Sequence, residues 1–222
     1  TNFTIDGGAG NDTITGTTGS DRVEGGANSD IVSYAYASTG LFITVDAAGT
    51  FTVVAGAGDT DILTGVENVV GGSSDDVLTG DAGVNTLDGG AGNDTITGNG
   101  SNDLLVGGSG NDTFLLTGGS DGTDTITDAS GSDTILGGAG VTDVLNVLSG
   151  LSNITGVEAF DGGAGAANTI LATAGNDVLD FSALAVTNFT IDGGTGNDTI
   201  TGTSSADILD GGAGNDTLSG RV

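Results

Sequence analysis

The chain repeats a nine-residue pattern along much of its length, and this period constrains the fold more than any other feature. Residues 7–15 and 89–97 both read GGAGNDTIT, residues 193–201 read GGTGNDTIT, and residues 211–219 read GGAGNDTLS. The shared form is G-G-x-G-x-D-x-U-x, where U is a large apolar residue, and it is typical of a parallel β-helix repeat. A period this short predicts a one-dimensional stack in which each repeat contacts only its neighbours.

Three stretches keep the nine-residue register, and eleven repeats fit it. The sixth positions are Asp12, Asp21 and Asp30, then Asp76, Asn85, Asp94, Asp103 and Asp112, and finally Asp198, Asp207 and Asp216. The apolar residues two positions later are Ile14, Val23 and Val32, then Leu78, Leu87, Ile96, Leu105 and Phe114, and finally Ile200, Leu209 and Leu218. A turn and a short strand return the chain by half a coil, so eighteen residues should close one coil and stack every second loop on one edge.

The pattern also indicates a ligand. Glycine at the first, second and fourth positions allows positive φ and close approach of neighbouring loops, which turns backbone carbonyls toward a common point. The aspartate adds charge, and several hard oxygen donors in a tolerant geometry suit Ca²⁺. The fold predicted is therefore all-β, a right-handed parallel β-roll or β-helix solenoid with several calcium ions between the GGxGxD turns. The rival EF-hand pattern, with its glutamate at the twelfth position, does not occur.

Charge and composition exclude several functions. Thirty Asp and Glu against two basic residues give a formal charge of −28, which repels nucleic acid and anionic membrane surfaces. No apolar run approaches transmembrane length, so membrane insertion is not expected. Without His or Cys there is no Ser-His or Cys-His nucleophile system, and the few glutamates have no recognisable acid/base partner, so no enzyme is expected. Self-repulsion and a thin core predict that the chain is disordered without calcium.

Register changes divide the chain into five segments. We expect a β-roll block at 1–33, a β-rich insertion at 34–70, the main β-roll block with irregular final coils at 71–145, a β-helix-like connection at 146–192, and a truncated block at 193–222. Within the insertion, LFITV and FTVV predict a strand pair around residues 46–50. Residues 1–26 match residues 187–212 in 19 of 26 positions, an offset of 186 residues, which favours a window cut from a longer tandem array.

These nonapeptides resemble those of the repeats-in-toxin (RTX) family of secreted bacterial proteins. The resemblance implies that each ion is held by the sixth-position residues of two loops one coil apart, with carbonyls from the second and fourth positions of one loop and the first and third of the other. The sets carried over are Gly8, Gly10 and Asp12 with Gly25, Ala27 and Asp30; Gly72, Ser74 and Asp76 with Gly89, Ala91 and Asp94; Asp81, Gly83 and Asn85 with Gly98, Gly100 and Asp103; Gly90, Gly92 and Asp94 with Gly107, Ser109 and Asp112; and Gly194, Gly196 and Asp198 with Gly211, Ala213 and Asp216.

Asp21 and Asp207 hold the sixth position in two further loops and complete the candidate ligands. Binding should be weaker or absent where Asn85 offers a neutral oxygen, where Asn28 replaces the fourth glycine, and where residues 16–19 lack the second glycine. In the looser coils, the acidic side chains either bind further ions or only solvate the surface; these are Asp121, Asp124, Asp128 and Asp133.

The resemblance implies a structural module of a large bacterial protein that is exported by type I secretion and folds on calcium outside the cell or at its surface. An adhesin, a surface layer and an extracellular fibre all fit, and exposed strand edges would favour end-to-end self-association. The alternatives are a carrier module of a toxin or secreted hydrolase, and an ice-binding face. The ice-binding alternative needs one flat ladder of Thr13, Thr15, Thr95, Thr97, Thr199 and Thr201.

Overall fold

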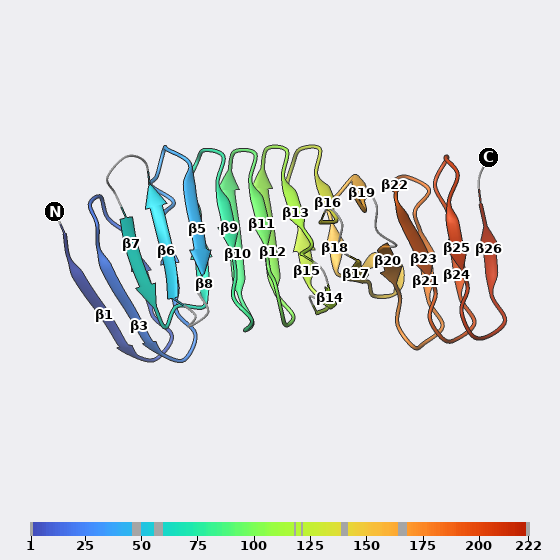
Figure 1. The fold of residues 1–222 in the computed structure, drawn as a ribbon, viewed down its shortest axis with the longest axis horizontal. Helices are drawn as coiled ribbons and strands as arrows, with labels where there is room; N and C mark the ends of the chain where they lie inside the picture. The colour runs from blue at the N-terminus through green and yellow to red at the C-terminus, as the bar shows by residue number, and fades with distance from the viewer. Residues whose placement is uncertain are drawn as a thin grey trace.

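The computed structural model describes residues 2–45, 50–55, 60–117, 119–120, 122–138, 142–163 and 168–220. In these ranges the chain consists of short β-strands and one 3₁₀ turn, η1, at Ser149–Leu151, with no α-helix. The strands lie side by side along one long axis, and the chain termini lie at opposite ends of the stack (Figure 1). The prediction of an all-β parallel solenoid is confirmed.

The described strands form four sheets, and within each sheet neighbouring strands follow the order of the chain except for β5, β6 and β7, whose order is reversed. The first, in spatial order, holds β1 (Thr4–Ala9), β3 (Arg22–Ala27), β7 (Thr60–Thr64), β6 (Thr50–Ala55), β5 (Leu41–Val45), β9 (Val77–Thr79), β11 (Thr95–Thr97), β13 (Thr113–Leu115), β16 (Thr134–Leu136), β19 (Ala159–Asp161) and β22 (Ala185–Thr187). The second holds β18 (Ile154–Thr155), β15 (Thr125–Thr127), β12 (Leu104–Ser109), β10 (Thr86–Ala91), β8 (Asn68–Val70), β4 (Ile31–Ser33) and β2 (Thr13–Thr15). The third holds β14 (Gly119–Ser120), β17 (Asp143–Asn146), β20 (Asn168–Leu171), β23 (Phe189–Asp192) and β25 (Ile208–Asp210), and the fourth holds β21 (Val178–Asp180), β24 (Thr199–Thr201) and β26 (Thr217–Ser219).

In the regular blocks, each strand pairs in parallel with the strand one coil further on. Thr95 of β11 pairs with Thr113 of β13, and the contacts that join these coils have a sequence separation of 18 residues. Thr199 of β24 pairs with Thr217 of β26 at the same separation. The predicted eighteen-residue coil is confirmed, because a nine-residue period places every second repeat on the same sheet.

The apolar residue of each repeat points into the stack. In the main block these five side chains are at most 3% exposed; they are Leu78, Leu87, Ile96, Leu105 and Phe114. Three-residue strands alternate sides, so only the middle residue of each faces inward and forms the core. At the C-terminal end the rule weakens, since Leu218 is 45% exposed where the described coils stop.

In its described residues, the insertion of residues 34–70 contains four strands, β5, β6, β7 and β8, where the sequence predicted one strand pair. The expected pair is confirmed as β5 and β6, which are antiparallel; residues 46–49, which join them, lie outside the described residues. The third strand, β7, is antiparallel to β6 and parallel to β3, with Arg22 opposite Ile62. Strand β7 thus pairs with β3 where the next coil would lie, and β5, at the other side of these three strands, pairs in parallel with β9.

The coils lengthen after β13. Thr113 pairs with Thr134, Thr134 with Ala159, and Ala159 with Ala185, so the eighteen-residue spacing is lost while the pairing stays parallel. Buried residues such as Phe160, Ile170 and Phe181 fill these wider coils. Among the described residues, no helix has the length and apolar character needed to cross a membrane.

Candidate metal centre

Glycine-rich loops one coil apart lie directly over each other. In the first block, Gly8 pairs with Gly26 and Ala9 with Ala27, and the Gly10 amide donates a hydrogen bond to the Ala27 carbonyl at 3.2 Å. The stacking follows from the strand register, because each loop continues a strand already paired with its neighbour. The structure therefore brings the residues of each predicted loop pair to one edge of the solenoid.

All five predicted loop pairs are stacked in this way. The backbone contacts that join them are Gly10 N to Ala27 O for 7–12 and 25–30; Ala91 N to Gly72 O for 71–76 and 89–94; Gly80 N to Thr97 O for 80–85 and 98–103; Gly92 N to Ser109 O for 89–94 and 107–112; and Gly196 N to Ala213 O for 193–198 and 211–216. In the second pair Ser74 approaches Gly92, and in the third Gly100 lies over Ala82 beside Gly83.

The sixth-position aspartates form ladders along the solenoid edges. In each step, one carboxylate oxygen accepts a hydrogen bond from the amide of the aspartate one coil earlier. Asp94 Oδ1 accepts from the Asp76 amide at 2.7 Å, and Asp112 Oδ1 accepts from the Asp94 amide at 2.7 Å. The same contact joins Asp30 to the Asp12 amide, Asp103 to the Asn85 amide, and Asp216 to the Asp198 amide.

The second oxygen of several ladder aspartates is buried without a hydrogen-bond partner. This holds for the Oδ2 atoms of Asp12, Asp30, Asp94, Asp112 and Asp198. Four of these residues, all but Asp12, are at most 1% exposed. An unpartnered buried carboxylate oxygen is destabilising unless it meets a cation, since burial removes the water that would otherwise solvate it. These atoms therefore fit the oxygen donors that a hard cation takes.

The first glycine of each loop leaves the space into which these oxygens point. A Cβ atom placed on Gly193 would lie 2.6 Å from Asp198 Oδ2 and 2.9 Å from the Gly211 carbonyl of the next coil. At Gly7 the corresponding distances are 2.8 Å to Asp12 Oδ2 and 2.6 Å to the Gly25 carbonyl. Because a carboxylate and a carbonyl from successive coils converge here, the donor set matches the chemistry of calcium rather than that of a softer metal.

The ladder carboxylates sit in an environment that disfavours their charge. Burial raises the pKa of Asp94 to about 7; the hydrogen bond from the Asp76 amide lowers it, while the negative charges of Asp112 and Asp76 raise it further. Burial likewise raises the pKa of Asp76 and of Asp112. Since burial penalises the ionised form and a nearby cation favours it, a bound cation would restore the charge of these groups.

Asp21 and Asp207 occupy a different local setting. The Asp21 carboxylate accepts from the Thr17 hydroxyl and the Phe3 amide. Asp207 accepts from the Thr203 amide at 2.9 Å and the Thr203 hydroxyl at 2.8 Å. Thr17 and Thr203 stand at the second position of their loops, where the motif has glycine. Each therefore donates a hydrogen bond to the aspartate of its own loop.

Asn85 is also satisfied by the protein. Its Oδ1 accepts from the Asp81 amide at 2.8 Å, and its Nδ2 donates to the Glu67 carbonyl at 2.9 Å. Both polar atoms of the side chain are thus hydrogen-bonded within the protein, and weaker binding by this loop pair stays a prediction.

Two glutamates join the ladders although the motif does not identify them. Glu67 Oε2 accepts from the Asp30 amide at 2.9 Å, and Glu158 Oε2 accepts from the Asp133 amide at 2.8 Å. Glu67 stands nine residues before Asp76 and two before the buried Val69. The nine-residue spacing alone could therefore have identified Glu67 as a sixth-position residue. Of the open candidates in the looser coils, Asp124 and Asp133 lie in the ladders, and Asp121 lies outside the described residues.

The sequence comparisons agree with this geometry. The family model of the RTX calcium-binding nonapeptide repeat (4 copies) matches residues 4–33, 61–96, 79–114, 118–141, 161–180 and 190–221. Because these matches together cover more than half of the chain, the protein belongs to the RTX family of calcium-binding repeats. A comparison with curated proteins found no match.

Proposed function

We propose that this chain is a calcium-folded structural segment of a large bacterial protein that acts outside the cell or at its surface, as part of an adhesin, surface layer or extracellular fibre. The five stacked loop pairs would hold the ions, within blocks 1–33, 71–145 and 193–222. Segments 34–70 and 146–192 would connect them. Membership of the RTX family supports calcium binding, and the long offset repeat supports an extended array rather than a single carrier block.

The observation that carries the proposal is the set of buried, unpartnered Oδ2 atoms in the aspartate ladders. The sequence has only two basic residues and no histidine, so protein cations cannot neutralise thirty acidic side chains. Arg22, the basic residue that is described, pairs with Glu24 at 2.9 Å at the surface. Calcium would supply the missing positive charge, and the free energy of binding would then be folding free energy.

Export fits the affinity expected of such sites. Calcium sites of extracellular modules have dissociation constants of about 10⁻⁴–10⁻³ M, so they fill outside the cell and stay empty at low cytosolic calcium. The aspartate ladders would then repel one another in the cytosol, which keeps the chain unfolded for passage through a secretion channel.

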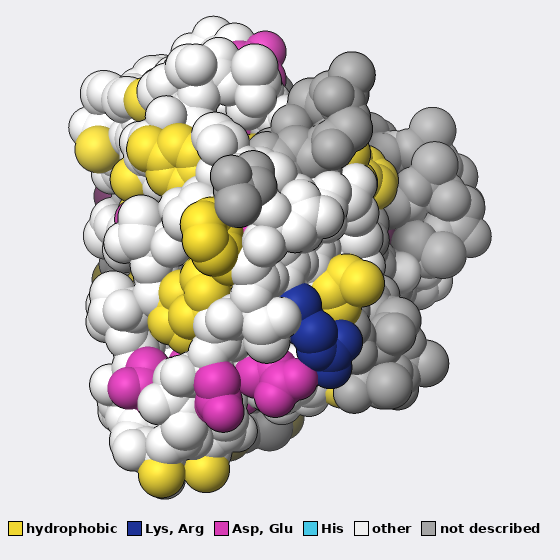
Figure 2. All heavy atoms as spheres, turned by 90° about the vertical axis from the view of Figure 1, so that its left-hand side faces the viewer, with side chains coloured by type: hydrophobic (Ala, Val, Ile, Leu, Met, Phe, Trp, Pro, Cys, Tyr) yellow, Lys and Arg dark blue, Asp and Glu magenta, His cyan; other side chains and the backbone are white. Residues whose placement is uncertain are grey.

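The end of the stack supports association into longer arrays. Figure 2 shows the N-terminal end, where hydrophobic side chains are exposed. Phe3, which is 50% exposed, belongs to this end, and strand β1 is the edge of its sheet. An open solenoid end offers unpaired backbone groups and apolar surface, so a neighbouring copy or the adjoining part of the same array would cover it.

The threonines proposed for an ice-binding face lie on three different sheets. Thr13 and Thr15 belong to β2, Thr95 and Thr97 to β11, and Thr199 and Thr201 to β24. Thr97 is also buried. These six residues therefore do not form one flat ladder, which favours the structural role.

A calcium titration followed by circular dichroism tests the proposal. Addition of calcium to the chelated protein should convert a coil spectrum into a β spectrum, and excess chelator should reverse the change. Magnesium at the same concentration is the matched control, since it demands a stricter octahedral geometry and should not substitute. A complete β spectrum in excess chelator would overturn the proposal.

A further inference from the structure

In the loop that begins at Asp128, a carboxylate stands at the first position of the motif, where the repeat has a glycine. Residues 128–133 read DASGSD, which places Asp128 at the first position of the motif and Asp133 at the sixth. Ser109 forms a parallel bridge with Ser130, and the Ala129 amide donates to the Gly108 carbonyl, so loop 128–133 stacks on loop 107–112 as the regular loops do. Asp128 therefore stands at a position defined by the fold and not in a displaced loop.

The Asp128 side chain takes the place of a backbone carbonyl. In the regular pairs, the space at the first glycine faces the carbonyl of the first glycine one coil on, as Gly7 faces the Gly25 carbonyl. At Gly107 that space is approached by Asp128 Oδ1 and by Asp112 Oδ2. A negatively charged oxygen thus stands where the other sites have a neutral one.

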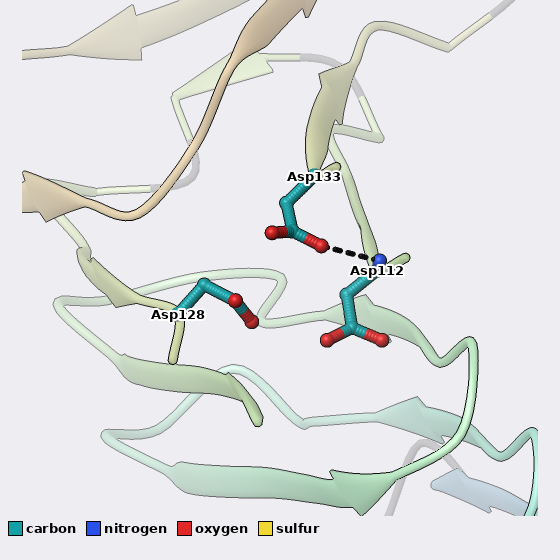
Figure 3. A group of neighbouring side chains, drawn as sticks. All are labelled: Asp112, Asp128 and Asp133. Carbon is teal, nitrogen blue, oxygen red and sulfur yellow. Dashed lines mark hydrogen bonds between the residues drawn. The ribbon is translucent and has the colours of Figure 1, made fainter. Parts of the chain in front are cut away.

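Three carboxylates converge at this point. Asp112, Asp128 and Asp133 each offer an oxygen within 4.8 Å of the other two, and Figure 3 shows their side chains directed toward a common space. Two oxygens that bind one Ca²⁺ at about 2.3–2.6 Å can lie up to about 5 Å apart, and 4.8 Å is the upper limit for each pair among these three. The separation is therefore compatible with a single calcium ion.

In each of the three carboxylates, one oxygen accepts a backbone hydrogen bond and the other has no hydrogen-bond partner. The Oδ1 atoms accept backbone hydrogen bonds: Asp112 from the Asp94 amide at 2.7 Å, Asp133 from the Asp112 amide at 2.7 Å, and Asp128 from the Gly108 amide at 2.9 Å. The Oδ2 atom of each of the three is buried with no hydrogen-bond partner. Asp112 and Asp133 are each 1% exposed, so water does not solvate their charge.

We infer that Asp112, Asp128 and Asp133 form a three-carboxylate calcium site that holds its ion more tightly than the regular loop pairs of this chain. The inference rests on the proposed calcium-dependent function. Affinity in calcium sites rises with the number of charged ligands and with rigidity. Here backbone hydrogen bonds fix all three carboxylates before the ion arrives. This ion should be the last to leave the array as free calcium falls.

Calcium retained per chain, measured by native mass spectrometry over a series of buffered free calcium concentrations, tests the inference. The wild-type chain should keep one ion down to roughly tenfold lower free calcium than the others, a step set by one added charged ligand. Asp128→Asn preserves the acceptor for the Gly108 amide but removes the charge, and it should abolish this step. Asp128→Gly restores the residue that the motif uses at this position, and it should do the same.

Asp192→Asn is the matched control, because Asp192 Oδ1 also accepts a glycine amide, that of Gly194, at 2.8 Å, yet Asp192 lies outside the cluster. This control should retain the one-ion step. Superimposed retention curves for wild type and Asp128→Asn, with calcium bound in both, would overturn the inference and leave the proposed function standing. A wild-type chain that binds no calcium would overturn both.

Discussion

Asp94 belongs to two loop pairs, so its removal should affect two ions. Its Oδ1 accepts the Asp76 amide, its own amide donates to Asp112, and its Oδ2 is buried without a partner. Asp12 and Asp216 each belong to one predicted pair. We expect Asp94→Ala to remove about twice as much calcium-binding free energy from the stability of the folded chain as Asp12→Ala or Asp216→Ala.

The magnitude follows from mass action. At about 10 mM calcium, a site with a dissociation constant of ~10⁻⁴–10⁻³ M contributes about 1.4–2.7 kcal/mol. Two ions lost with Asp94→Ala therefore amount to about 3–5 kcal/mol. The Asp76 amide also loses a charged acceptor, which adds about 1.5–3 kcal/mol. Asp94→Asn separates the two contributions, because it keeps an acceptor for this amide and removes the charge.

Urea unfolding at fixed calcium, monitored by circular dichroism, measures these differences, and the calcium midpoint for folding gives an independent value. Asp94→Ala should shift that midpoint further upward than either single-pair variant and should make the transition broader, since the main block is split. Equal losses for Asp94→Ala and Asp216→Ala would refute the assignment of ions to loops one coil apart.

The remaining predictions concern charge, pH, backbone and assembly. Asn85→Asp removes the donor to the Glu67 carbonyl but adds a second carboxylate to its loop pair, so it should lower the calcium midpoint for folding; calcium titrations followed by circular dichroism check this, and an unchanged or raised midpoint would show that this loop holds no ion. Because the folded pKa of Asp94 is raised to about 7 from about 4 in the unfolded chain, the folded state binds more protons between these values, and in chelator stability should fall as pH rises from about 4 to 7. Circular dichroism across that range, with and without calcium, checks the sign of this pH dependence. Bound calcium should abolish the dependence. Gly8 and Gly108 both have positive φ, at 94° and 110°, but only at Gly108 would a Cβ atom meet a carbonyl of the preceding coil; Gly108→Ala should therefore unfold at clearly lower urea than Gly8→Ala. Light scattering should show end-to-end association that grows with concentration in calcium, and a monomer at all concentrations would contradict the open-end argument.

The repeat alone was enough to predict the coil. Once the chain places an apolar residue every nine positions, Leu87 and Ile96 must alternate between opposite sheets, and each must lie one coil from its next equivalent. The stacking of Asp76 under Asp94 follows from the same spacing. These features depend on local periodicity, which the order of residues contains in full.

Deviations from the period depended on the tertiary structure. The sequence does not show that strand β7 pairs with β3, or that the Tyr34 hydroxyl donates to Asp61 at 2.7 Å inside the core. It also does not show that the side-chain amide of Asn85 donates a hydrogen bond to the Glu67 carbonyl of the preceding coil. Each depends on where an irregular segment returns to the stack.

Asp128 illustrates the difference most clearly. In the sequence it is one acidic residue among thirty, and whether it bound an ion or only faced solvent stayed open. In the structure its carboxylate lies against Asp112 and Asp133, because parallel pairing of β13 with β16 places loop 128–133 over loop 107–112 after an irregular stretch. Periodicity specifies which residues face the same edge, but only the folded backbone decides that the Asp128 side chain enters the space beside Gly107.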